Sequence, residues 1–125
     1  DYAKSMWLML QNKKPEDFVI ATGEQHSVRE FVELAFSFIS IKIKWIGEGV
    51  HEKGIDEKTG NTLIEIDPKY YRPTEVDSLL GDPTKAEKKL GWNPKETSFK
   101  KLVEIMIKHD IKLVENEIRI KQSDE

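Results

Sequence analysis

With 125 residues, the chain is long enough for one domain, residues 1–125, and too short for two of the usual about 100–200 residues each. Its 20 Lys and Arg residues against 23 Asp and Glu residues leave a net charge of -3, which favours neither nucleic acid nor a membrane surface as a partner. The absence of cysteine excludes disulfides, thiolate metal sites and a cysteine nucleophile.

Four elements are predicted in the N-terminal third of the chain. An uninterrupted apolar stripe at helical spacing predicts a helix over residues 3–11. A short, partly β-branched run bounded by a proline and a glycine predicts a buried strand over 17–22. The run Ser27-Val28-Arg29-Glu30 fits a capping box that begins a helix reaching about Ser40. Apolar residues that alternate with lysines then predict a strand over 41–46, near a sheet edge, with one buried face.

The middle of the chain is predicted to be mostly irregular. Residues 47–60 hold four glycines and mixed charges, which indicate a mobile loop or the tip of a hairpin that returns as a strand over 62–66. The aromatic and charged segment 68–75 contains two prolines, so it is predicted to form an extended surface loop. Loops of this kind often carry functional groups.

Two helices are predicted in the last third of the chain. Asp82 caps the first of them, and Gly91 closes it. A hydroxyl residue at 97–98 caps the second, whose apolar residues recur at helical spacing as far as Val114. The polar tail 121–125 is expected to fray.

Together these elements predict an α/β fold, with helices around a small sheet made of the strands at 17–22, 41–46 and 62–66. No apolar run reaches the about 18–20 residues that span a bilayer, and the N-terminus lacks the order of a signal peptide. We therefore expect a soluble, cytoplasmic protein with no membrane partner.

The sequence supports few kinds of catalysis or cofactor binding. No Gly-x-Ser-x-Gly elbow is present, and the three histidines lie in different elements without metal-ligand spacing. The pair Gly47-x-Gly49 lacks the third glycine and the strand-to-helix context of a dinucleotide-binding loop. The basic and aromatic cluster 69–72 is too small a footprint for nucleic-acid binding. No catalytic residue, cofactor site or metal site is therefore predicted.

Arg72 and Glu75 are the two residues that could bind a ligand. The proline after Arg72 favours an extended backbone, which can hold a long side chain across a groove. A guanidinium matches diphosphate oxygens, and a carboxylate accepts hydrogen bonds from the two hydroxyls of a ribose. From the residues alone, a surface ion pair between Arg72 and Glu75 is the simpler interpretation.

Three blocks of the sequence resemble a known family, the extended short-chain dehydrogenases/reductases. They are Tyr70–Asp77, Gly81–Ala86 and Leu90–Pro94. The first block, taken with residues 1–10 and 15–31, is similar to the GDP-mannose 4,6-dehydratase family in particular. The resemblance covers nearly the whole chain and is weakest at 50–61 and after Val114.

The resemblance implies that this chain is the C-terminal, substrate-binding part of a longer protein. In the family, an N-terminal Rossmann domain binds NADP and holds a Tyr-x-x-x-Lys pair with a Thr or Ser and a Glu. The reaction moves a hydride from C4 of GDP-mannose to NADP, eliminates water across C5 and C6, and returns the hydride to C6. Its product is GDP-4-keto-6-deoxymannose, the precursor of GDP-fucose. This chain has neither the Tyr-x-x-x-Lys pair nor a glycine fingerprint, so we expect it to be inactive alone.

The resemblance also implies roles for single residues and for partners. Arg72 corresponds to an arginine on the substrate diphosphate, and Glu75 to an acidic residue on the nucleotide ribose. Ser27 and Arg29 begin a helix that can face the same pocket. The implied partners are GDP-mannose, the missing Rossmann domain and, in the parent protein, further copies in a homo-oligomer. The helix at 3–11 would pack on the Rossmann domain, so the isolated chain is expected to expose Trp7 and its neighbours.

Two other functions stay open. The chain could be a non-catalytic module of the same fold that binds a nucleotide sugar or a protein, or part of another sugar-nucleotide dehydratase or epimerase. Coding sequence upstream of Asp1 distinguishes a module from an enzyme, because only the enzyme needs the glycine fingerprint and the Tyr-x-x-x-Lys pair. Trp7, Trp45 and Trp92 are interpreted as packing residues rather than sugar platforms.

Overall fold

The computed structural model of the chain describes residues 1–72 and 78–123 and divides them into two compact units. The first unit holds residues 1–26 and 78–99, and the second holds 27–72 and 100–123. Each is described by itself. The expectation of a single domain over residues 1–125 stays a prediction.

The core of the first unit lies around Trp92, which is 2% exposed. The helices α1 (Tyr2–Leu10) and α3 (Thr84–Leu90) contact each other here. They place one small residue each, Ser5 and Ala86, at fully buried positions. Small side chains let two helices approach closely, and the Ser5 hydroxyl is satisfied by the Tyr2 carbonyl at 2.6 Å. The predicted helix at 3–11 is thus confirmed within a residue at each end.

The C-terminal end of α3 agrees with the sequence, but its N-cap is Pro83 and not the predicted Asp82, and no side chain forms a cap hydrogen bond. Asp82 stands one residue before this cap, and its carboxylate accepts a hydrogen bond from the Thr84 amide at 2.9 Å. This bond and that from the Thr84 hydroxyl hold the pKa of Asp82 below its usual value. Gly91 ends the helix in the left-handed conformation, with φ at 63°, which suits a residue without a Cβ atom.

The strand predicted at 17–22 is wrong. In the described part of the chain these residues form no ladder hydrogen bonds and lie outside the sheet. They pack instead beside Gly81, where an added Cβ atom would lie 2.6 Å from the Cβ of Ala21 and 3.2 Å from Val19. Lys85 also donates to the Asp17 carbonyl at 2.8 Å. The β-branched run is therefore used for side-chain packing and not for strand pairing.

The second unit contains a three-stranded antiparallel sheet of β1 (Ile43–Ile46), β2 (Lys53–Asp56) and β3 (Thr62–Glu65), in that order. The strands predicted at 41–46 and 62–66 are thus confirmed, and β1 is an edge strand as expected. The middle strand β2 lies inside the segment predicted to be a loop or a hairpin tip. A short 3-10 helix, η1 (Gly49–His51), connects β1 to β2.

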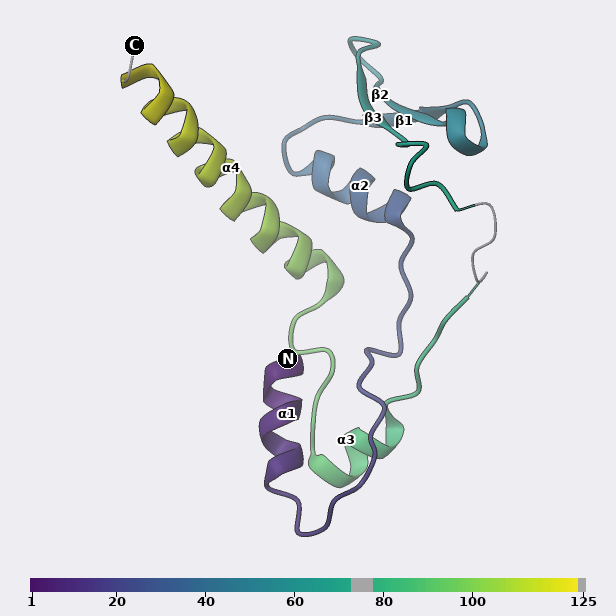
Figure 1. Cartoon of the computed structure of the whole chain (residues 1–125), viewed down its shortest axis with the longest axis vertical. Coiled ribbons are helices and arrows are strands. Elements are labelled where there is room, and N and C mark those ends of the chain that lie inside the picture. The colour runs from purple at the N-terminus through teal and green to yellow at the C-terminus, as the bar shows by residue number, and fades with distance from the viewer. Residues whose placement is uncertain (73–77, 124–125) are drawn as a thin grey trace. The chain divides into compact units, whose positions relative to one another are not determined.

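Two helices accompany the sheet in this unit (Figure 1). The helix α2 (Val28–Ser37) packs on β1 and buries Ala35. The helix α4 (Phe99–Ser123) buries Val103, and its Ile107 lines a small hollow of about 90 Å³ with Ala35 and Phe36 of α2 and with Ile39 just after α2. The helix runs well past Val114, so residues 121–123 of the tail that was expected to fray are helical.

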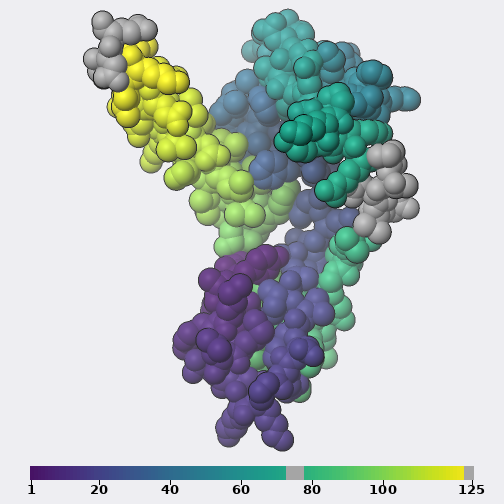
Figure 2. All heavy atoms as spheres, in the orientation of Figure 1, coloured from purple at the N-terminus to yellow at the C-terminus, as the bar shows by residue number. Residues whose placement is uncertain are grey.

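One face of α1 stays open to solvent. Met6, Trp7 and Leu10 are 63%, 60% and 82% exposed. This confirms the expectation that the chain exposes Trp7 and its neighbours, and Figure 2 shows the purple atoms of α1 at the surface. None of the helices within 1–72 and 78–123 is long and apolar enough to cross a membrane.

Candidate functional site

The predicted ligand-binding residues that the structure describes all lie in the second unit. Ser27 caps the N-terminus of α2, where its hydroxyl accepts a hydrogen bond from the Glu30 amide at 3.1 Å. The Glu30 carboxylate accepts in return from the Ser27 amide at 2.7 Å. The predicted capping box is therefore confirmed, and it occupies the Ser27 hydroxyl.

Arg29, in the first turn of α2, lies against groups from two other places in the unit. Its guanidinium forms an ion pair with Glu52 and lies 5.2 Å from the centre of the Trp45 ring. The Trp45 indole N–H donates to Glu33, one turn further along α2, at 2.7 Å. The Glu52 carboxylate therefore lies against this guanidinium, and its charge opposes the approach of a phosphate to Arg29.

Arg72 follows a tight turn that begins at Asp67. The Lys69 amide donates to the Asp67 carboxylate at 2.9 Å, and the Tyr70 amide donates to the Asp67 carbonyl at 3.0 Å. The Tyr71 hydroxyl lies beside Gly49, where an added Cβ atom would be 3.5 Å from the hydroxyl oxygen. Arg72 itself is exposed. Glu75, the predicted ribose ligand, lies outside the described residues.

The short helix η1 lies between Arg29 of α2 and the turn that precedes Arg72. Glu52, at its C-terminal cap, forms an ion pair with Arg29 of α2, and Gly49, at its first position, lies beside the Tyr71 hydroxyl. Sequence reasoning missed Glu52 altogether and assigned Trp45 only a packing role. The glycines at 47–60 could have indicated close packing around Trp45, since Gly54 is the register partner of Trp45 and leaves space for its ring.

The described residues contain no group of three side chains that could hold a metal ion. A dinucleotide usually sits at the carboxyl ends of parallel strands that are joined through helices. The sheet found here is antiparallel, and Gly47 and Gly49 lead into a three-residue 3-10 helix. The described residues therefore do not fit NADP.

Comparison with known proteins gives a consistent result. The family model described as GDP-mannose 4,6 dehydratase matches residues 1–106. A GDP-mannose 4,6 dehydratase of Dictyostelium discoideum is 61% identical over 93% of this chain, which is 32% of that protein. One of Homo sapiens is 54% identical over 91% of the chain, and one of Sinorhizobium fredii is 50% identical over 89%. The chain spans about a third of the length of these curated relatives.

Proposed function

Because the chain belongs to the GDP-mannose 4,6-dehydratase family, we propose that it is the C-terminal, nucleotide-sugar-binding part of such an enzyme. The complete protein would convert GDP-mannose to GDP-4-keto-6-deoxymannose. The family match over residues 1–106 is the observation that carries this proposal. Since the chain has no Tyr-x-x-x-Lys pair and no glycine fingerprint, its own role is to bind and orient the substrate.

We assign the contact with the nucleotide to Arg72 and Glu75. Arg72 would bind the diphosphate through its planar donors, and Glu75 would accept hydrogen bonds from the ribose hydroxyls. The exposure of Arg72 supports this role, because a phosphate can reach it from solvent. Ser27 and Arg29 lie in the same unit at the N-terminus of α2, as candidates for a further contribution to the site.

NADP would belong to the rest of the complete protein. When bound there, it would supply the hydride-transfer chemistry that the reaction needs. The residues of this chain would contribute only by holding the nucleotide sugar. The open apolar face of α1 supports a Rossmann domain as its neighbour, because exposed large side chains such as Trp7 and Leu10 gain stability when another surface covers them. We also propose that the complete protein forms a homo-oligomer and that it is located in the cytoplasm.

Binding of GDP to the 125-residue chain tests the proposal. We expect a saturable shift of the Arg72 side-chain NMR signal with GDP and a smaller one with ADP. The variant Arg72→Ala should lose the binding. Lys69→Ala is the matched control, because it removes a cation from the same turn, where the ammonium lies 5.3 Å from the Tyr70 ring centre. Equal loss in both variants would mean that general positive charge, and not Arg72, binds GDP.

A second measurement separates the enzyme from the binding module. The chain alone should release no GDP-4-keto-6-deoxymannose from GDP-mannose in the presence of NADP. The protein encoded by the complete gene should do so. If the complete gene encodes no Tyr-x-x-x-Lys pair, the dehydratase function is wrong and a non-catalytic module is the better description.

A further inference from the structure

Trp45 forms the centre of a polar cluster between α2 and the sheet. On the helix side, the Arg29 guanidinium lies 5.2 Å from its ring centre, and Glu33 accepts its indole N–H at 2.7 Å. On the sheet side, Gly54 is its register partner in β2. A Cβ atom at Gly54 would lie 3.2 Å from the Trp45 ring, so the ring occupies space that only glycine leaves open.

The same cluster holds η1 by its C-terminal end. Arg29, which lies over the Trp45 ring, also binds Glu52, and Glu52 is only 22% exposed in its side chain. At the other end of η1, the turn through Gly47 is tight, because an added Cβ atom would lie 2.5 Å from the His51 carbonyl oxygen. The position of η1 is therefore determined by its entry turn and by the Arg29–Glu52 ion pair.

The segment that carries Arg72 lies against this short helix. The Tyr71 hydroxyl lies beside Gly49, the first residue of η1, because a Cβ atom added there would be 3.5 Å from the hydroxyl oxygen. Tyr71 precedes Arg72 directly, so a displacement of η1 changes the support of the backbone at Arg72. The contacts run from α2 through Glu52 and η1 to Tyr71.

We propose that Arg29 and Glu52 are positioning residues that, together with Trp45, hold η1 and thereby place Arg72 for the nucleotide diphosphate. Arg29 then acts through Glu52 and does not itself bind the ligand. The Glu52 carboxylate beside Arg29 supports this, because it already balances the charge of the guanidinium. The inference rests on the proposed function for its ligand, but the positioning itself can be measured without one.

The test compares Glu52→Gln with Glu57→Gln. Both substitutions remove the charge of a carboxylate in an ion pair of the same unit, since Glu57 pairs with Lys42 at 2.8 Å. In the ligand-free chain, Glu52→Gln should shift the NMR signals of the Tyr71 ring and the Arg72 side chain, and Glu57→Gln should not. Glu52→Gln should also weaken GDP binding by about fivefold, the size that the loss of one partly exposed ion pair gives.

Exchanging the charges of Arg29 and Glu52 should restore the ion pair in the opposite direction. The double variant Arg29→Glu with Glu52→Arg should restore the Tyr71 and Arg72 signals toward those of the unchanged chain, whereas either single variant should not. If Glu52→Gln leaves both free-state signals unchanged, the inference is wrong whether or not GDP binds. If the signals shift but the unchanged chain does not bind GDP, the positioning stands and the proposed function fails. If Arg29→Ala abolishes GDP binding without moving these signals, Arg29 contacts the ligand directly and the inference is overturned.

Discussion

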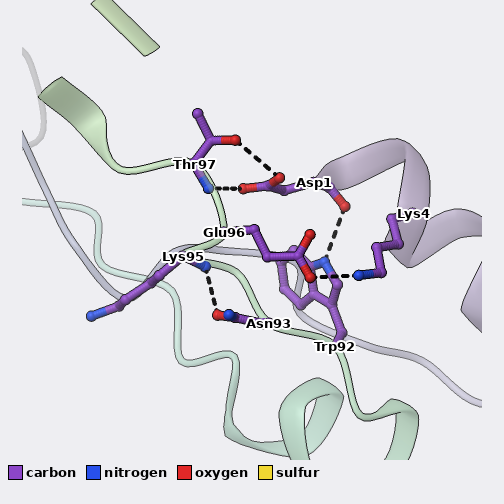
Figure 3. Close-up of polar contacts among 7 residues, drawn as sticks. All are labelled: Asp1, Lys4, Trp92, Asn93, Lys95, Glu96 and Thr97. Carbon is purple, nitrogen blue, oxygen red and sulfur yellow. Dashed lines mark hydrogen bonds and ion pairs between the residues drawn. The ribbon is translucent and has the colours of Figure 1, made fainter. Parts of the chain in front are cut away.

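The Trp92 indole N–H donates a hydrogen bond to the Asp1 carbonyl at 3.0 Å and thereby ties residues 92–97 to the start of α1 (Figure 3). The Asp1 carboxylate extends the same connection, because it accepts from the Thr97 amide at 2.9 Å. Lys4 and Glu96 add an ion pair beside it. Segments at opposite ends of the sequence of the first unit are therefore joined through one buried indole.

Replacing this indole should destabilise the chain. Trp92→Phe removes the hydrogen bond and part of a buried ring, so we expect the free energy of unfolding to fall by about 1–3 kcal/mol. Urea denaturation measures this change in the free energy of unfolding. Trp7→Phe is the matched control, since Trp7 is 60% exposed and its replacement should change stability by less than about 0.5 kcal/mol. Equal losses in the two variants would contradict the assignment of Trp92 to the core.

Glu16 should make the stability depend on acid pH. Hydrogen bonds from Lys89 at 2.5 Å and from Lys85 lower the pKa of Glu16 from its ordinary value of 4.5. A lowered pKa in the folded chain means that the stabilisation is complete above pH 4.5 and is lost as the pH falls through the folded value. The free energy of unfolding should thus fall less steeply below pH 4.5 in Glu16→Gln than in the unchanged chain.

High salt provides the control for this titration. The ammonium groups of Lys85 and Lys89 are about half exposed, so dissolved ions screen their attraction to Glu16. The difference between Glu16→Gln and the unchanged chain should shrink as the salt concentration rises. A difference that persists at high salt would mean that Glu16 acts through something other than these two lysines.

The sequence predicted best what depends on neighbouring residues. The capping box at Ser27 and the left-handed Gly91 were predicted correctly, because both are satisfied within a few residues along the chain. The edge strand at 43–46 was recognisable from its alternation alone. In contrast, strand β2 contains Gly54, which disfavours a strand locally, and its glycine is explained only by Trp45 on the neighbouring strand, whose ring would lie 3.2 Å from an added Cβ atom.

The features that the sequence did not predict depend on contacts between residues that are far apart along the chain. Residues 17–22 have the composition of a strand, but the sheet belongs to the other unit, and this run is used instead in packing against Gly81. The ion pair between Arg29 and Glu52 joins residues 23 positions apart, which no spacing rule indicates. Ligand contacts by Arg72 and Glu75 stay predictions, and only the resemblance to a family favours them over a surface ion pair.

The close approach at Gly81 can be tested by exchanging a methyl group. Gly81→Ala should destabilise the chain by about 1–3 kcal/mol, because its Cβ atom would lie 2.6 Å from that of Ala21. The double variant Gly81→Ala with Ala21→Gly removes the second methyl group and should recover part of the loss. If the double variant is as unstable as the sum of both single variants, the two positions do not contact each other.

Ser27 offers a separation of stability from binding. Ser27→Ala removes the hydroxyl that accepts the Glu30 amide, so we expect a loss of about 1 kcal/mol in the free energy of unfolding. Ser27→Asn keeps an N-cap acceptor and should retain most of the stability. Because the capping box already occupies the hydroxyl, both variants should bind GDP within about twofold of the unchanged chain. Titration of each folded variant measures this. A stable Ser27→Asn variant that binds GDP more than about tenfold more weakly would instead place Ser27 in contact with the ligand.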